Sequence, residues 1–571
     1  MSEESSTYYS TDIQKALFQT LLRRIPVKEY STHLEDLVDI LMDALSQGEL
    51  EVDLKQKLNQ SNLKSPGWPH AHITALLESG WSTGEAAPFV LSGNQLSWRR
   101  WYYAINDVVE DLIHRSKTRV NRIQGTRNRG VSMPPSGLNQ EQKSAVRLIE
   151  SQGVVLLSGG PGTGKTSTVM MMLENALSLN PNLNIGLAAP TGKAARRLQN
   201  SLREGITKFT SPYQKVLLGI PCDTLHRWLK ASPYGFAKNA QKPLDLDLLI
   251  VDEMSMVELS LMKALLEALQ PSTQLILVGD PNQLPPIGSG AIWHHLHKEE
   301  IYKDFRECAV RLQQTYRNRG ELASVSKLLC EQGVSAFWDG LAKLPASANI
   351  QSHECNLNSI PHLLLKRLKD HSRQLEHLTK RLAESLAMQS KQPSLISTQI
   401  NNEKEELFCC LEELLVLCPQ RYGLWGVDEI HKVLLGKNIE NGLPNWPQGT
   451  PIMCIENQPD LELSNGDLGV VIGEGDQRRL LFRNILGEGE LAARFIHPAR
   501  MKTIQPALAM TIHKAQGSEA NEVIVLLRQN FTKSLQANKK NDKHKSYEER
   551  LLYTAITRSK NKVDLIVEPR K

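Results

Sequence analysis

The hydrophobic residues of this 571-residue chain follow different patterns in successive regions. Up to about residue 115 they recur at helical spacing, as in THLEDLVDILMDALSQGELEVDL, whose helix we expect to end near Gly48. A turn at Ser92-Gly93-Asn94 between two short apolar runs predicts a hairpin, and the residues after it predict another helix. Residues 1–115 are therefore predicted to form a mainly helical N-terminal domain.

From Leu138 onward, short apolar runs alternate with helical segments. The runs GVVLLSG, NIGLAAPT, LDLLIVDE and QLILVGD are typical of strands buried in a parallel sheet with helices on its faces. A second series follows Glu413, with ELLVLCP, NEVIVLLR and KVDLIVE. The pattern predicts an α/β protein with two parallel-sheet domains, residues 138–340 and 341–571.

Four segments do not fit this alternation. Residues 116–137 are basic and rich in Gly and Pro, which predicts a linker that either contacts DNA or is a solvated hinge. Residues 366–407 form a polar helical insert without a clear buried stripe, and residues 447–505 are predicted to be a small β-rich insertion in the second domain. Residues 530–549 are lysine-rich, which is typical of a solvated surface loop and leaves DNA contact as the alternative.

Composition narrows the class of protein without selecting a function. The eight cysteines are scattered with no C-x-x-C pair, which disfavours a zinc or iron–sulfur site and fits a reducing compartment. The chain has no apolar run of about eighteen residues and a polar, acidic N-terminus, so we expect a cytoplasmic protein without a membrane span. Because the net charge is only +5, any DNA-binding surface must be local.

The clearest chemical signal is the stretch GGPGTGKT, which follows an apolar run and precedes a helical one. Its glycines allow backbone N–H groups to face phosphate oxygens, and the helix N-terminus adds its dipole. Lys165 is predicted to reach the β- and γ-phosphates of ATP, and the Thr166 hydroxyl to bind Mg²⁺. The predicted nucleotide-binding residues of this motif are Gly159, Gly160, Pro161, Gly162, Thr163, Gly164, Lys165, Thr166 and Ser167.

Further candidates lie downstream, where other apolar runs end. Asp252 and Glu253 close LLIVDE; we expect Asp252 to hold Mg²⁺ and Glu253 to polarise the attacking water. Gln283, in GDPNQLPP, has an amide that can both donate to and accept from groups near a γ-phosphate. Arg317 and Arg558 offer guanidinium groups that could meet the charge developing during hydrolysis.

In order, LNQEQKSAV, GGPGTGKT, APTGKAARRL, DTLHRWL, VDEMSMV, GDPNQLPPIGSG, QTYRN, MTIHKAQGSE and LLYTAITR resemble the motif series of superfamily 1 helicases, and within it the RecD family, the exonuclease V alpha subunits. The resemblance implies paired RecA-like motor domains and 5′-to-3′ movement on single-stranded DNA. It also implies that Gln142 lies at the adenine edge and that Arg317 and Arg558 are arginine fingers.

A second Gly-Lys pair, in APTGKAARRL, lacks the glycines that precede the first pair. Its N–H groups and hydroxyl could hold a phosphate, and in the family this position contacts the DNA backbone. Trp228 could stack on a base or pack in the core. The predicted DNA-binding residues, from this turn, DTLHRWL and MTIHKAQGSE, are Thr191, Gly192, Lys193, Thr224, His226, Thr511, His513 and Ser518.

Three functional hypotheses remain open. The first is a subunit of a RecBCD-type helicase/nuclease in DNA repair and recombination, which would bind single strands and duplex ends with RecB-like and RecC-like partners. The second is a stand-alone helicase, and the third is an ATP-gated DNA clamp that does not unwind. No paired-carboxylate nuclease site is evident beyond the ATPase pair. The N-terminal aromatic residues either dock a partner or form a core of their own: Trp68, Trp81, Trp98, Trp101, Tyr102 and Tyr103.

Overall fold

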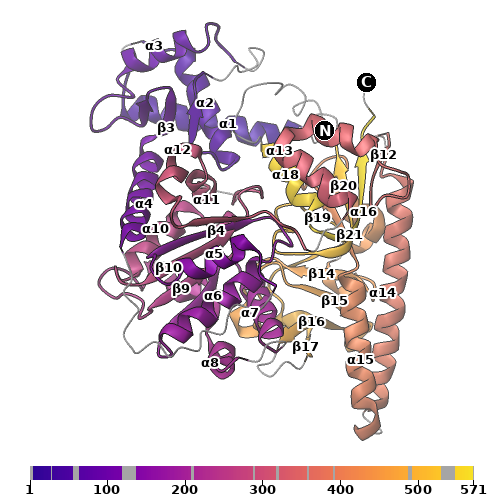
Figure 1. The fold of residues 1–571 in the computed structure, drawn as a ribbon. Coiled ribbons are helices and arrows are strands. Elements are labelled where there is room, and N and C mark those ends of the chain that lie inside the picture. Colours follow the sequence, from indigo (N-terminus) through magenta and orange to yellow (C-terminus); the bar gives the residue numbers. More distant parts are fainter. Residues whose placement is uncertain are drawn as a thin grey trace. The chain divides into compact units, whose positions relative to one another are not determined.

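Two compact units make up the chain, which we analysed as a computed structural model (Figure 1). The first unit comprises residues 1–160, 164–190 and 194–313, and the second comprises residues 161–163, 191–193 and 314–571. The structure describes residues 4–27, 29–55, 63–118, 137–207, 211–286, 290–316, 320–356, 359–389, 393–440, 442–485, 491–528 and 547–569.

The N-terminal region combines helices with a small antiparallel sheet of order β1-β3-β2. As predicted, the second helix ends just before Gly48, and a hairpin turns at residues 92–95. Its core contains Phe18, Leu34, Trp81 and Phe89, all nearly inaccessible to solvent. The elements are α1 (Glu4–Arg24), α2 (Thr32–Ser46), β1 (Glu51–Asp53), α3 (His70–Ser79), β2 (Phe89–Ser92) and β3 (Gln95–Trp98).

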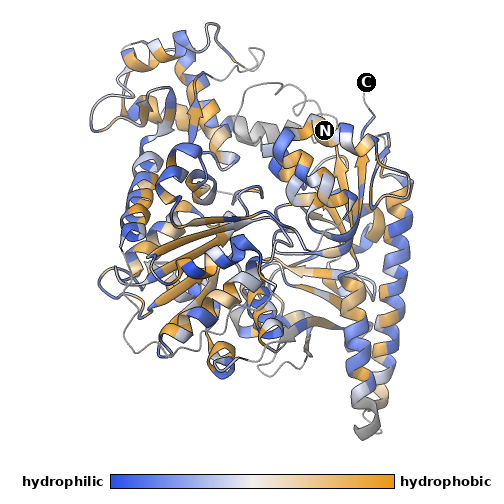
Figure 2. Ribbon diagram, viewed as in Figure 1, coloured by the Kyte–Doolittle hydropathy of each residue, from blue (hydrophilic) through white to orange (hydrophobic). Residues whose placement is uncertain are grey.

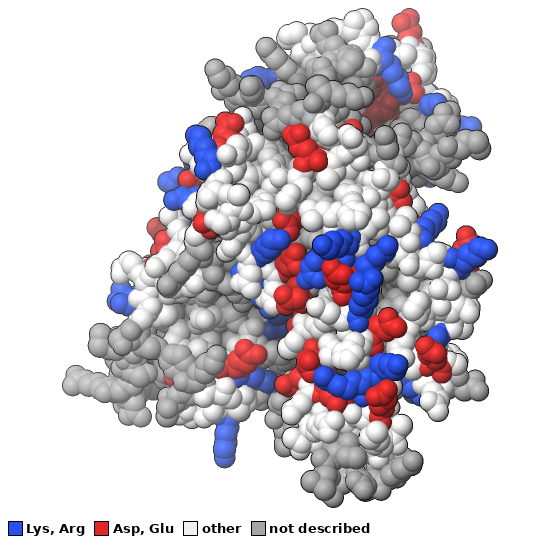
Figure 3. All heavy atoms as spheres, turned by 90° about the vertical axis from the view of Figure 1, so that its right-hand side faces the viewer, with Lys and Arg blue, Asp and Glu red and all other residues white. Residues whose placement is uncertain are grey.

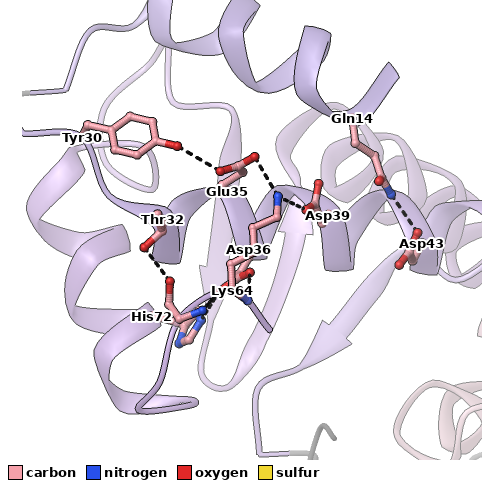
Figure 4. Close-up of polar contacts among 10 residues, drawn as sticks. Gln14, Tyr30, Thr32, Glu35, Asp36, Asp39, Asp43, Lys64 and His72 are labelled. Carbon is pink, nitrogen blue, oxygen red and sulfur yellow. Dashed lines mark hydrogen bonds and ion pairs between the residues drawn. The ribbon is translucent and has the colours of Figure 1, made fainter. Parts of the chain in front are cut away.

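A polar network ties the segment around residue 64 to α2 (Figure 4). The buried Asp36 carboxylate accepts hydrogen bonds from the backbone N–H groups of Lys64 (2.9 Å) and Ser65 (3.0 Å) and from His72 Nε2 (3.1 Å). Lys64 Nζ bridges Glu35 (2.7 Å) and Asp39 (2.8 Å). Burial lowers the pKa of His72 in spite of Asp36, so the ring is a neutral donor to the carboxylate.

Helix α4 (Arg99–Lys117) packs on the first motor domain, against α10 (Leu259–Ala268). Val108 and Leu112 are buried in the same core as Leu265. The guanidinium of Arg115 donates to the carbonyls of Leu266 (3.2 Å), Leu269 (3.2 Å) and Gln270 (2.9 Å), which lie at and just after the end of α10. Most of the predicted linker, residues 119–136, lies outside the described residues.

The first motor domain is built on a six-stranded parallel sheet of order β11-β4-β10-β9-β5-β6. Four of its six strands are the apolar runs noted in the sequence, and they lie in the hydrophobic interior of this unit in Figure 2. The strands are β4 (Val154–Gly159), β5 (Ile185–Ala189), β6 (Cys222–Thr224), β9 (Leu248–Val251), β10 (Gln274–Gly279) and β11 (Ala309–Leu312). The main helices beside it are α5 (Gln140–Leu148), α6 (Lys165–Leu179) and α7 (Gly192–Thr207).

The second unit contains a five-stranded parallel sheet of order β12-β21-β20-β13-β19. The sequence placed the end of the first motor domain at residue 340, whereas α13 (Glu321–Ala342) packs against α18 (Tyr547–Ile556) and β12 of this unit. The strands are β12 (Ile350–Glu354), β13 (Leu414–Cys418), β19 (Met510–Thr511), β20 (Ala520–Leu527) and β21 (Ser559–Val567).

The polar insert has a buried stripe that the sequence analysis missed. Helices α14 (His362–Gln389) and α15 (Pro393–Leu411) form a hairpin whose Leu375, Leu382 and Phe408 share a core with the β insertion. Its apolar residues are separated by runs of charged ones, so average polarity hid their spacing.

On the face drawn in Figure 3, positive and negative side chains are interspersed among the described residues, with no stripe of one sign.

The predicted β-rich insertion is confirmed as a five-stranded antiparallel sheet of order β17-β16-β15-β14-β18. Its strands are β14 (Pro451–Cys454), β15 (Leu468–Ile472), β16 (Arg479–Ile485), β17 (Leu491–Ile496) and β18 (Ile504–Pro506). Within the described part of the chain, no helix combines the length and the apolar character needed to cross a membrane.

Candidate functional site

The carboxyl edge of the first sheet brings the predicted ATP-binding turns together. The Gly-rich loop follows β4, the Asp252–Glu253 pair follows β9, and Gln283 follows β10, which pairs with both of the other strands. The second Gly-Lys turn follows β5, and Thr224 ends β6, on the other side of β9. Because the carboxyl ends of parallel strands meet at one edge, the strand order groups the ATP turns and separates the two predicted DNA turns from them.

The Gly-rich loop has the backbone of an anion-binding turn. Gly162 (φ 74°) and Gly164 (φ 83°) adopt left-handed conformations, and Gly164 caps the helix that begins at Lys165. The Lys165 ammonium donates to the carbonyls of Gly159 (2.7 Å) and Gly160 (3.0 Å). A bound phosphate would therefore exchange with these carbonyls for the ammonium, while the loop N–H groups and the helix dipole favour negative charge there.

Two adjacent carboxylates follow β9. Asp252 accepts a hydrogen bond at Oδ1 from the backbone N–H of Glu253 (2.8 Å), and its own N–H donates to the Ala188 carbonyl of β5 (2.9 Å). Glu253 adopts a left-handed backbone (φ 54°, ψ 45°), which is unusual for a residue with a side chain and which clusters at functional sites. Burial, and then the neighbouring Glu253 carboxylate, raise the pKa of Asp252, and Lys165 partly offsets them.

This electrostatic setting fits a divalent cation. A cation beside Asp252 would relieve the penalty that raises its pKa, and Thr166 lies in the first turn of α6, at the same edge of the sheet. Mg²⁺ typically takes one or two protein ligands and completes its shell with phosphate oxygens and water. The described residues contain no cluster of three His, Cys, Asp or Glu side chains suited to a metal ion.

Gln283 lies buried in the loop after β10, with 4% of its surface exposed. Its backbone carbonyl accepts a hydrogen bond from His294 Nε2 (2.8 Å), and its amide nitrogen lies 3.5 Å from Asp280 Oδ2. Among the described residues its Oε1 has no hydrogen-bond partner. A buried amide oxygen without a partner fits a group that pairs with a water or a ligand during turnover.

Gln142 has a structural role that the sequence reasoning missed. It forms a capping box at the start of α5: its N–H donates to Asn139 Oδ1 (2.8 Å), and its Oε1 accepts from the Asn139 N–H (3.1 Å). The signal was visible as Asn followed three residues later by Gln. The cap alone accounts for the placement of Gln142, so its adenine contact stays a prediction.

The arginines predicted as fingers belong to residues 314–571. Arg317 lies outside the described residues. Arg558 precedes β21 at the amino edge of the second sheet, and its Nε donates to the Thr554 carbonyl of α18 (3.0 Å). Its side chain is nearly fully buried.

The predicted DNA residues of the first sheet occupy different settings. Gly192 opens α7 directly after the β5 turn, and Thr224 caps α9 (Leu225–Trp228) by accepting from the Arg227 N–H (3.3 Å). His226 is exposed. Trp228 packs in the core, since its Nε1 donates to the Leu187 carbonyl (2.8 Å), so the base-stacking alternative is not supported.

The second unit holds the remaining predicted DNA residues. Thr511 ends β19 and accepts from the Lys514 N–H (3.4 Å). His513 stacks on Tyr547 and contacts its hydroxyl (3.0 Å), and burial lowers the pKa of His513 to about 4. Residues 191–193 are assigned to this unit, in which Lys193 Nζ donates to Ser518 Oγ (2.6 Å). Two of the predicted DNA-binding residues, Lys193 and Ser518, are thus hydrogen-bonded to each other.

Comparisons with known proteins identify the family. Residues 142–289 match the AAA domain family, and residues 506–566 match the UvrD-like helicase C-terminal domain family. The "RecBCD enzyme subunit RecD" of Mycolicibacterium smegmatis is 31% identical over 94% of this chain and 90% of its own length. The chain belongs to the RecD family. It is accordingly an ATP-hydrolysing DNA helicase of superfamily 1 with RecA-like motor domains.

Two further relatives match at lower identity. The RecD subunit of Haemophilus influenzae is 28% identical over 75% of this chain and 68% of its own length. The "ATP-dependent RecD2 DNA helicase" of Deinococcus radiodurans is 29% identical over 75% of this chain and 48% of its own length. Among solved structures, Bacteroides Pif1 bound to single-stranded DNA is 18% identical over 76% of this chain and 92% of its own, with a TM-score of 0.40.

Proposed function

We propose that this RecD-family chain is the 5′-to-3′ motor subunit of a RecBCD-type helicase/nuclease. It would work on DNA ends in the cytoplasm during double-strand break repair and recombination. The observation that supports this proposal best is the strand order of the first sheet. That order groups the Gly-rich loop, the acidic pair and Gln283, and it leaves a second Gly-Lys turn and Thr224 at the ends of neighbouring strands.

In the proposed ATPase cycle, Lys165 leaves the loop carbonyls to pair with the phosphates of ATP, and Thr166 and Asp252 hold Mg²⁺. Mg²⁺, when bound, neutralises developing phosphate charge. Glu253 orients and deprotonates the attacking water, since its carboxylate is next to Asp252 and shares its sheet edge. Gln283 senses the γ-phosphate through its unpaired Oε1.

In the same proposal, DNA is held through its backbone. The N–H groups at the start of α7, the Thr191 hydroxyl and the Lys193 ammonium are of the kind that contact phosphates, and such contacts position a strand without reading its sequence. Arg317 and Arg558 remain the proposed arginine fingers. The Arg558 guanidinium would have to turn from the Thr554 carbonyl to reach a phosphate.

The proposal that the N-terminal region docks onto RecB-like and RecC-like partners keeps fewer candidate docking residues than the sequence offered. Trp81 is buried in that region's own core, and Trp68 and Trp98 pack against it, so these rings are not available as anchors. Tyr103 on α4 is half exposed and beside Arg99, which leaves this face of the helix for docking. Docking is therefore tested by Tyr103→Ala rather than by deletion of residues 1–115, because that deletion would also remove α4 and its packing on the motor domain.

The direct test is unwinding of short duplexes that carry either a 5′ or a 3′ single-stranded tail, using the chain co-purified with its RecB-like and RecC-like neighbours. A Lys165→Gln chain in the same complex is the control, because it removes only this subunit's ATP turnover. Loss of unwinding confined to 5′-tailed substrates would support the proposal. ATP turnover without unwinding would favour an ATP-gated clamp, and full unwinding by the chain without partners would favour a stand-alone helicase.

A further inference from the structure

The turn between α2 and β1 lies on the loop that carries Gln283, within the first unit. The Gly48 carbonyl accepts a hydrogen bond from the N–H of Ala291 (3.1 Å). A Cβ added to Gly48 would meet Pro285 Cβ at 2.7 Å and Cγ at 2.8 Å. Gly48 has a left-handed backbone (φ 80°), so both the conformation and the close approach require glycine.

Leu50 continues this contact into the core of the motor domain. It is 7% exposed and belongs to the same hydrophobic cluster as Met254 and Trp293, although it comes from the N-terminal region. A Cβ on Gly290 would meet Leu50 Cδ1 at 2.8 Å. Beside Leu50, the Glu51 carboxylate forms an ion pair with Lys298. The turn therefore contacts the described residues of the loop on both sides of residues 287–289.

The elements under this turn hold the ATPase residues. Helix α11 (Ile292–Leu296) presents His294, whose Nε2 donates to the Gln283 carbonyl (2.8 Å). Trp293 of the same helix packs against the end of β10, where a Cβ on Gly279 would meet its Nε1 at 2.9 Å. The Cβ of Met254, the residue after Glu253, lies 3.0 Å from that same added Cβ. A shift of Ala291 or Pro285 would thus be passed on to Gln283 through one or two contacts.

We infer that Gly48 and Leu50 are positioning residues for Gln283, so that the N-terminal region controls ATP turnover directly. This inference rests on the proposed role of Gln283. The turn contacts the loop at Pro285 and Ala291, and through His294 of α11 it holds the Gln283 carbonyl in place. The Gln283 side chain then keeps the position in which its Oε1 can bind a water or the γ-phosphate. A partner that moved the N-terminal region would change the rate of hydrolysis without touching nucleotide or DNA.

The test compares Gly48→Ala with Gly93→Ala in the full-length chain. Both glycines are left-handed and both lie in the N-terminal region, but a Cβ on Gly93 would meet nothing within 4 Å. The two variants therefore carry a similar backbone strain, and only Gly48→Ala pushes on Pro285. We expect Gly48→Ala to lower the kcat of DNA-stimulated ATP hydrolysis about tenfold, and Gly93→Ala to leave it unchanged. Nucleotide affinity should agree between the two variants, and thermal melting should show that both are folded at the assay temperature.

A double-mutant cycle with Gln283→Ala shows whether Gly48 acts through Gln283. In that background Gly48→Ala should have no further effect on kcat, because the group it displaces is gone. Leu50→Ala gives the same test without a strained glycine, with Leu76→Ala, buried in the N-terminal region's own core, as its control. Equal losses for Leu50→Ala and Leu76→Ala, or additive effects in the cycle, would overturn the brace. If Gln283→Ala alone left kcat unchanged, the proposed role of Gln283 would fail instead.

Discussion

Two Gly-Lys turns follow two strands of the same parallel sheet, β4 and β5, yet they are built differently. In the first, Gly162 and Gly164 adopt left-handed conformations, and the Lys165 ammonium folds back onto the carbonyls of Gly159 and Gly160. In the second, Gly192 opens α7, and the Lys193 ammonium donates to Ser518 Oγ. The preceding glycines, which only the first turn has, are therefore what we expect to distinguish a turn for a triphosphate from one for a single phosphate.

The largest effect should come from a substitution in the first Gly-Lys turn, the Gly-rich loop. Lys165→Gln removes the ammonium that meets the phosphates but keeps a polar side chain of similar length. We expect ATP hydrolysis to fall about a hundredfold or more, equivalent to about 3 kcal/mol of transition-state stabilisation, with thermal stability unchanged. Steady-state ATPase assays measure this rate, and a loss of only a few-fold would contradict the role of Lys165 in binding the phosphates of ATP.

Glu253→Gln separates the rate of ATP hydrolysis from the affinity for ATP. The amide keeps the shape of the side chain but cannot accept the proton of water, so turnover should fall by a factor of about 10² to 10⁴. ATP affinity should stay within a few-fold of wild type, since Lys165 and Thr166 remain. Nucleotide binding measured beside single-turnover hydrolysis decides the point: a parallel loss of both would make Glu253 a structural residue.

Loss of the Arg115 contacts should destabilise the first unit. Arg115→Ala removes the guanidinium donor from three carbonyls near the end of α10, of which those of Leu266 and Gln270 keep a backbone donor, and we expect a loss of about 2 kcal/mol of folding stability. Lys263→Ala is the matched control, because Lys263 also joins α10 to α4, through Asp107, but both side chains are largely exposed; it should cost less than about 1 kcal/mol. Denaturant unfolding gives both values, and equal ones would show that the buried Arg115 contacts contribute no more to stability than an exposed ion pair.

A substitution in the second Gly-Lys turn should have a smaller effect, and on the affinity for DNA rather than on ATP hydrolysis. Lys193→Ala should weaken single-stranded DNA binding similarly for all sequences and reduce its salt dependence by about one phosphate contact. Basal ATPase activity without DNA should change little. Binding isotherms at several salt concentrations measure the slope, and an unchanged slope would mean that Lys193 does not contact a phosphate.

The smallest effect concerns charge at His513. Burial lowers its pKa to about 4, so it stays neutral across the range in which an ordinary histidine gains a proton. The salt slope of DNA binding should therefore be the same at about pH 7.5 and pH 6. Stability should fall as the pH drops from about 6.5 toward 4, because the unfolded chain then binds a proton that the fold excludes. His513→Gln should reduce this fall, and a steeper salt slope in the wild type at pH 6 would show a charged His513.

The sequence could predict those parts of the fold that depend on local pattern. Strands buried on both faces are uninterrupted apolar runs, and the Gly-rich loop has its own backbone requirements, so both sheets and the Lys165 turn were predictable. The Asp252–Glu253 pair and Gln283 followed from their positions at strand ends, and the structure places all three at one sheet edge.

The features that were missed depend on partners distant in the chain. Arg115 is the last residue of the predicted N-terminal domain, and only the structure shows that it donates to three carbonyls near the end of α10 in the first motor domain. The apolar residues of α14 are sparse until α15 and the β insertion cover them. Trp81 is an interface candidate in the sequence and a core residue in the structure, where Phe18 and Phe89 surround it.

The most direct test of the account measures two affinities for the same substitution placed in either turn. Lys165→Gln and Lys193→Gln are compared for binding of a non-hydrolysable ATP analogue and, separately, of single-stranded DNA without nucleotide. The account predicts a crossed result: Lys165→Gln loses affinity for the analogue alone, and Lys193→Gln loses affinity for DNA alone. If both variants lost the same ligand, or if Lys193→Gln lost the analogue as strongly as Lys165→Gln, the two turns would not have separate ligands and the central claim would be contradicted.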